Sequence, residues 1–285
     1  MDLEADIGSS VSYEAHDKKT LPAPALRDEA PINEPDSDLT TWGVIKRGWF
    51  LFTFQSGKQL LCASVGALPL ALFFALTICL PMMLPEAYAD LWLIALLIFD
   101  VAYVLYCPIV FGALTCLASA AHCAEPISIT TAYRRTMAHY GQLLLAVFGV
   151  YLGTLLGMYL LIVPGLWYMA KYGLAWIIVP LEKCGVSEAF RRSDALLKKR
   201  KTSFLIIFGL FMLMQAITVG VFLAVTLLWD AATESVAVKF IVLFLTMELL
   251  MMSVAPYIPV LTAFYYDCVR RKRIGDAAFQ VHISE

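Results

Sequence analysis

One stretch decides how the chain is interpreted: residues 164–201, PGLWYMAKYGLAWIIVPLEKCGVSEAFRRSDALLKKRK. It begins with a Pro-Gly pair that predicts a turn, continues as an apolar helix, and ends in a dense cluster of lysine and arginine. Cytoplasmic loops of membrane proteins carry an excess of these two residues. An apolar segment ending in such a cluster therefore predicts a membrane span whose basic end lies in the cytoplasm.

The composition of the whole chain agrees with this interpretation. Of 285 residues, 60% are hydrophobic and only 15% are charged, and the mean hydropathy is +0.75. Soluble domains carry about 25% charged residues. Because the apolar residues gather in runs long enough to cross a bilayer, we expect an all-α, polytopic membrane protein.

Six apolar runs predict six transmembrane helices arranged as three hairpins, and each hairpin follows a basic amphipathic segment of the interfacial type. With six spans, the lysines and arginines outside the first 38 residues lie on one side of the membrane, apart from Lys171 and Lys239. Because an excess of these residues marks the cytoplasmic side, both termini are predicted to be cytoplasmic. The predicted spans are 60–83, 91–121, 140–163, 166–181, 204–229 and 240–266, and the amphipathic segments are 39–58, 127–139 and 186–201.

The three amphipathic segments share a short motif. The sequences VIKRG (44–48), AYRRT (132–136) and AFRRS (189–193) each place a basic pair between an apolar and a small residue. A proline marks the last helix of each predicted hairpin, at Pro108, Pro180 and Pro259. Repeated units of this kind are common in membrane proteins, and the motif predicts a threefold internal repeat.

Four stretches resemble one group of bacterial inner-membrane proteins. They are IVPGLW (162–167), the Pro180-Leu-Glu182 helix end, SEAFRRS (187–193) and AFYYDCVRRKR (263–273). Together they are similar to the YciC-like family and to the membrane domain found with some glycerophosphoryl diester phosphodiesterases. The resemblance implies a helical membrane fold over residues 40–273 and a place in the inner membrane. It implies no phosphodiesterase activity, which would need a separate barrel of about 250 residues.

The two ends of the chain differ from the apolar region 39–273. Residues 1–38 carry a net charge of −7, against +5 for the remaining chain, and contain four prolines. Such a segment is typical of disorder; it is either a solvated cytoplasmic tail or a docking segment for a protein partner. Residues 274–285 are expected to form a short cytoplasmic tail.

Motifs for catalysis are absent from the sequence, so an enzyme is not expected, and nothing indicates a metal, a cofactor or a nucleic-acid partner. Three charged residues inside predicted spans, Asp100, Lys171 and Glu248, form either an ion or substrate path or a charge cluster that fixes helix packing. Gly149, Gly153 and Gly157 predict close helix packing.

Two functions follow as expectations. The first is a non-enzymatic organiser that binds anionic lipids or partner proteins at the cytoplasmic face. The alternative is a small transporter or channel that uses the three intramembrane charges. The candidate headgroup-binding residues are Lys46, Arg47, Arg134, Arg135, Arg191, Arg192, Lys198, Lys199, Arg200 and Lys201.

Overall fold

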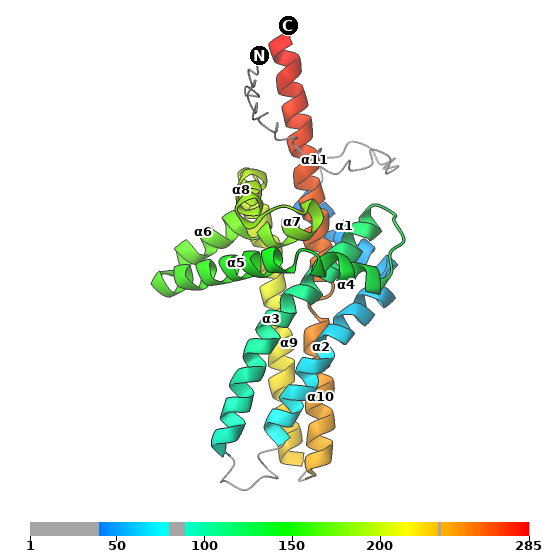
Figure 1. Ribbon diagram of the computed structural model, residues 1–285, viewed down its shortest axis with the longest axis vertical. Helices are drawn as coiled ribbons and strands as arrows, with labels where there is room; N and C mark the ends of the chain where they lie inside the picture. Colours follow the sequence, from blue (N-terminus) through cyan, green and yellow to red (C-terminus); the bar gives the residue numbers. More distant parts are fainter. Residues whose placement is uncertain (1–39, 80–88, 233–234, 285) are drawn as a thin grey trace, which may run out of the picture. The chain divides into compact units, whose positions relative to one another are not determined.

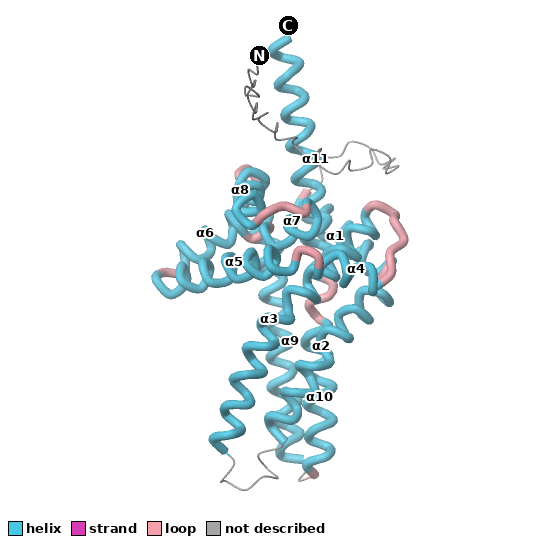
Figure 2. Tube along the Cα trace, viewed as in Figure 1, coloured by secondary structure: helices cyan, strands magenta, loops and turns pink. Residues whose placement is uncertain are grey.

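The computed structural model describes residues 40–79, 89–232 and 235–284, all within one compact unit. These residues are helical apart from short turns and caps, as Figures 1 and 2 show. The prediction of an all-α chain is confirmed for this part. The predicted acidic tail, 1–38, lies outside the described residues.

The described residues form eleven helices. In chain order these are α1 (Thr41–Phe54), α2 (Ser56–Cys79), α3 (Ala89–His122), α4 (Ile129–Met137), α5 (Tyr140–Leu160), α6 (Ile162–Tyr172), α7 (Ala175–Glu182), α8 (Val186–Leu197), α9 (Lys201–Ala232), α10 (Val236–Met252) and α11 (Tyr257–Ser284).

Long apolar helices dominate the fold. Among the described residues, five segments are long and apolar enough to cross a membrane: Ser56–Phe73, Val104–His122, Tyr140–Leu160, Ile162–Glu182 and Lys201–Val225. Val236–Thr246 in α10 is a shorter apolar segment. Helix α10 packs against α2 and α9, and α2 packs against α3. Helices α5 and α6 run across the direction of these four helices (Figure 1).

The sixth predicted span, 240–266, is not one continuous helix. Helix α10 ends at Met252, and a turn through Pro256 separates it from α11. Pro256 lacks an amide hydrogen, so it cannot continue the hydrogen-bond ladder of α10. Pro259 lies in the first turn of α11, where no amide donor is needed. Helix α11 then continues to Ser284, so most of the predicted tail 274–285 is helical.

The fourth predicted span also differs from expectation. The turn after α5 lies at Leu161, which is extended (φ −164°, ψ 147°), and Pro164 and Gly165 fall inside the first turn of α6. Residues Gly173 and Leu174 then separate α6 from α7. A side chain at Gly173 would begin 2.3 Å from the Phe204 ring, so the chain bends where α9 approaches it closely.

The three amphipathic segments form α1, α4 and α8, and their shared motif has one pattern of burial. The first and last positions of each motif are buried and the third position is exposed, which puts one face of each helix on the protein interior. The buried positions are Val44 and Gly48, Ala132 and Thr136, and Ala189 and Ser193, and the exposed bases are Lys46, Arg134 and Arg191.

The helices α1, α4 and α8 each pack on the last helix of a hairpin, in a cyclic arrangement. Helix α4 packs on α3, α8 packs on α7, and α1 packs on α11. Each amphipathic helix therefore covers the last helix of the hairpin before it, and the first helix of the chain covers the last. The prolines of these inner helices, Pro108, Pro180 and Pro259, are all buried. Helix α3 also contacts both α7 and α11, so the inner helices meet one another.

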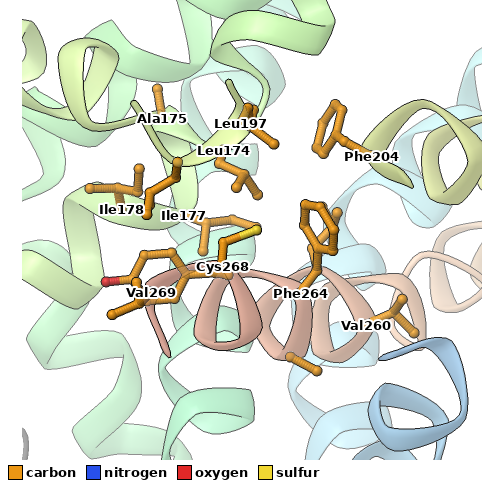
Figure 3. Packing of buried hydrophobic residues seen from close by; sticks show 14 of the residues in the cluster. Leu174, Ala175, Ile177, Ile178, Leu197, Phe204, Val260, Phe264, Cys268 and Val269 are labelled. Atoms are coloured by element: carbon orange, nitrogen blue, oxygen red, sulfur yellow. The ribbon is translucent and has the colours of Figure 1, made fainter. Parts of the chain in front are cut away.

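The first half of α11 forms the centre of the main core. Between Tyr257 and Val269 almost every residue is buried. Figure 3 shows the side chains of Phe264 and Cys268 facing residues of the α6–α7 turn, α7, α8 and α9. The rings of Phe204 and Phe264 lie 6.1 Å apart. Burying large aromatic and aliphatic side chains from so many helices makes this region the most tightly fixed part of the fold.

The contact between α1 and α11 gives a direct test of this arrangement. A methyl group at Gly48 would lie 2.3 Å from the Cα atom of Val260. We expect Gly48→Ala to destabilise the protein by about 1–3 kcal/mol, since backbone must move to admit it. Gly57→Ala is the matched control, because nothing lies within 4 Å of its added methyl group. Thermal unfolding in detergent should show a lower midpoint for Gly48→Ala alone; equal midpoints would contradict the packing.

Candidate functional site

Basic side chains gather on the outer sides of α1, α4 and α8 and on the turn that leads into α9. In Figure 1 these helices lie at one end of the long helices α2, α3, α9 and α10. The chain puts them there because the buried positions of each amphipathic helix face the core. The exposed bases of this group are Lys46, Arg134, Arg135, Arg191, Lys198 and Lys199.

Some of these bases have acidic partners on the surface. Arg135 lies 3.2 Å from Glu125, and Arg191 lies 3.6 Å from Glu188. Exposed pairs of this kind contribute at most about 1 kcal/mol. Among the described residues, Lys46, Arg47, Arg134, Lys198, Lys199 and Lys201 have no carboxylate at ion-pair distance. The surface formed by α1, α4 and α8 therefore keeps an excess of positive charge.

Arg192 has a partner inside the protein. Its Nε donates to Oε1 of Glu182 at 3.1 Å, and the hydroxyl of Tyr265 donates to the same oxygen at 2.6 Å. The three residues belong to α8, α7 and α11. The cluster therefore joins three helices through one carboxylate.

Arg200 likewise has a structural role. Its Nη2 lies 3.0 Å from Oδ2 of Asp267, and Nε of Arg271 lies 3.2 Å from both carboxylate oxygens. Only 6% of the Asp267 side chain is exposed. The Arg200 guanidinium also lies 5.6 Å from the ring centre of Phe264. A carboxylate this buried needs its cations, because an unpaired charge there would be strongly destabilising.

The two clusters explain why distant motifs occur together in this sequence. Glu182 ends the Pro-Leu-Glu stretch, Arg192 belongs to SEAFRRS, and Tyr265 and Asp267 belong to AFYYDCVRRKR. Their side chains meet in the structure. These motifs therefore carry contacts that hold α11 in place.

The predicted intramembrane charges do not form one group in the described residues. The amine of Lys171 lies 3.6 Å from Asp194 of α8. Glu248 accepts a hydrogen bond from Ser64 through Oε1, and its Oε2 is buried without a partner. The side chain of Asp100 lies outside those described.

The three predicted packing glycines all face residues of the same chain. A methyl group at Gly153 would lie 2.3 Å from the ring of Tyr168, and one at Gly157 would lie 2.7 Å from the Cα atom of Gly165. Gly149 faces the ring of Phe190 in α8 at 2.9 Å. The small residues therefore let α5 approach α6 and α8 closely.

A large apolar cavity lies between α5, α6 and α9. Its volume is about 700 Å³, within the range of ordinary ligand sites. Sequence reasoning missed it, because its lining residues are scattered over six helices and the α10–α11 turn and resemble lipid-facing side chains. The lining consists of Phe111, Val147, Val150, Tyr151, Thr154, Leu155, Met158, Leu166, Met169, Trp176, Leu205, Phe208, Gly209, Phe211, Met212, Val254, Tyr257 and Ile258.

Three acids with partners in the fold were also missed. Glu182, Asp194 and Asp267 each pair with a base of the candidate set or of its neighbourhood. Each is an isolated acid in or next to a strongly basic segment, and that was the available signal. Within the described ranges, no three His, Cys, Asp or Glu residues form a group suited to a metal ion.

Removing the buried carboxylate should loosen α11. We expect Asp267→Asn to lower the free energy of unfolding by about 3 kcal/mol, because it leaves the half-buried guanidinium of Arg200 without its anion. Burial raises the pKa of the neighbouring Cys268 thiol to about 12, so this thiol is protonated at pH 8. Alkylation of Cys268, followed by mass spectrometry, should therefore be slow in the parent protein and faster in the variant.

Glu188→Gln provides the comparison for this experiment. Its ion pair with Arg191 is exposed on both sides, so its loss should change stability by less than about 0.5 kcal/mol. Equal alkylation rates at Cys268 in the parent, Asp267→Asn and Glu188→Gln proteins would show that the buried cluster does not hold α11.

Comparisons of the chain with protein-family models, with curated proteins and with solved structures find no match. The function is therefore argued from the geometry of the protein itself.

Proposed function

We propose that this is a non-enzymatic, multi-pass protein of the bacterial inner membrane that gathers anionic lipids at its cytoplasmic face. One observation carries the proposal. Helices α1, α4 and α8 bury the same two motif positions and expose the same basic position. Such helices attract anionic headgroups when they lie along a membrane surface.

The charge distribution supports the orientation. The bases concentrate at the end of the long helices where α1, α4 and α8 lie (Figure 1). Excess lysine and arginine mark the cytoplasmic side of a membrane protein. Both termini are then cytoplasmic, and a protein partner that binds the acidic segment 1–38 would approach from that side.

The charges alone do not determine whether the α5–α6 hairpin crosses the membrane. The positive-inside rule fixes α4 and α8 on one side, whether the hairpin between them crosses the membrane or enters and returns. Its direction across α9 favours a hairpin that stays within the cytoplasmic half of the bilayer (Figure 1). We therefore propose four crossing segments, α2, α3, α9 and α10, in place of the six first expected. The hairpin turn is apolar, with Leu161 and Ile162 more than two-thirds exposed.

The transporter alternative has weaker support. Lys171 is paired with Asp194, and Glu248 is bonded to Ser64. The observation that favours transport is the second oxygen of Glu248, which is buried without a partner. A proton or cation path through this residue would predict that Glu248→Gln abolishes a membrane flux and leaves folding intact.

Neutralising the surface bases should weaken anionic-lipid binding. The triple variant Arg134→Gln, Lys198→Gln, Lys199→Gln removes three exposed charges. Each base near a membrane surface contributes about 1 kcal/mol, so the preference for anionic lipid should fall at least about fivefold. Quenching of tryptophan fluorescence by brominated phosphatidylglycerol in phosphatidylcholine bilayers measures this preference.

A double variant at the same face keeps the net charge unchanged. Arg191→Gln with Glu188→Gln removes one exposed ion pair and should reduce the preference for anionic lipid far less than the triple variant does. If brominated phosphatidylglycerol quenches the tryptophan fluorescence of the triple variant and of the parent equally, the proposed lipid preference is refuted.

Thiol labelling decides the path of the α5–α6 hairpin. In a variant whose accessible native cysteines are replaced, Leu161→Cys lies at the hairpin turn and Ala237→Cys lies near the start of α10. A membrane-impermeant maleimide added to intact cells should label Ala237→Cys from the periplasm and leave Leu161→Cys unlabelled. Equal labelling of both would restore the six-span arrangement.

A further inference from the structure

We propose that the cavity between α5, α6 and α9 holds one acyl chain of an anionic phospholipid from the cytoplasmic leaflet, with the headgroup beside Lys201 and Lys171. This inference rests on the proposed function, because it assumes that the basic end of the protein lies at the cytoplasmic surface. It goes further by assigning one lipid to one site.

The depth of the cavity fits a single leaflet. Its wall on α9 runs from Leu205 to Met212. Lys201 begins α9, one helical turn before Leu205. From Lys201 to Met212 the helix rises about 16 Å, which is about half of the roughly 30 Å hydrocarbon thickness of a bilayer. A lipid with its headgroup at Lys201 would therefore place its acyl chain along this wall.

The cavity is open to a chain that enters from the bilayer. Four of its large lining side chains are exposed: Tyr151, Leu155, Met158 and Met212. Their exposed fractions are 60%, 44%, 39% and 45%. The other walls, from α3, α7 and α11, are apolar and aromatic. An apolar ligand with a long, flexible chain suits such walls better than a polar solute, since polar groups buried there would lack partners.

The charges beside the cavity suit a negative headgroup. The amines of Lys171 and Lys201 lie 5.2 Å and 5.3 Å from the ring centre of Trp167, so they occupy the same neighbourhood. Asp194 neutralises Lys171, which leaves one net positive charge from Lys201. A tryptophan beside lysines is typical of the membrane interface, where headgroups lie.

An aromatic pair forms part of the cavity wall. Tyr257 lines the cavity and stacks on Phe211, with ring centres 3.8 Å apart. Its hydroxyl oxygen is buried and has no hydrogen-bond partner. Buried polar atoms without partners are uncommon because they are energetically costly. The hydroxyl is not exposed to the cavity, so the Tyr257 ring presents an apolar wall to the acyl chain.

Gly209 allows the cavity to be filled without disturbing its walls. It lines the cavity on α9, and nothing lies within 4 Å of a methyl group added to it. Leucine is also a better helix former than glycine, so Gly209→Leu should fold. Gly220→Leu is the matched control, since it lies on the same helix, has equally open surroundings and does not line the cavity.

Native mass spectrometry of the intact, delipidated protein titrated with phosphatidylglycerol tests the proposal. The parent and Gly220→Leu proteins should bind one lipid tightly, whereas Gly209→Leu should bind it at least tenfold more weakly. Lys201→Gln should lose the preference for phosphatidylglycerol over phosphatidylcholine.

Equally tight binding of the first lipid by Gly209→Leu and the parent would overturn the cavity assignment. This result is separable from failure of the proposed function. Tryptophan quenching reports the lipid that surrounds the protein, and Gly209→Leu should leave that preference unchanged. The triple variant of the surface bases should conversely reduce the quenching preference and retain the single tightly bound lipid.

Discussion

The structure depends on the burial of the first half of α11. This segment is central to the main core and is covered by α1, α3, α7, α8 and α9. It contains the buried carboxylate of Asp267 and the hydroxyl that bonds Glu182. Because the last helix of the chain is covered by the first, the amphipathic helices can close around a common centre. Apolar burial supplies the stabilisation, and the two polar clusters set the position of α11 along its neighbours.

The same constraint organises the candidate functional surfaces. Each amphipathic helix must turn its small and apolar motif residues inward, which leaves the intervening bases outside. The α5–α6 hairpin is fixed to the core by α7 and α8, and it leaves the cavity beside α9. The basic surface and the cavity are thus two consequences of one packing arrangement. A lipid at the proposed site would contact both, through its headgroup and its chain.

The sequence predicted the helical class, the apolar helices and the amphipathic helices because composition and hydrophobic period are local properties. The break at Gly173 could not be predicted from sequence, because the Phe204 ring that lies close to it belongs to another helix. The break at Pro256 has a local signal, since proline cannot continue the hydrogen-bond ladder of α10. Arg192 and Arg200 resemble surface bases in sequence, and only the fold reveals their partners Glu182 and Asp267.

The measurement that tests the central claim most directly is the lipid composition retained by the parent protein. The protein would be extracted from its native membrane in lipid-preserving polymer particles, and the lipids would be quantified by mass spectrometry. The account predicts enrichment of anionic lipid over the bulk membrane, lost on neutralising the exposed bases of α4 and the turn after α8. Retained lipid with the bulk composition in both proteins would contradict the claim that this protein gathers anionic lipids.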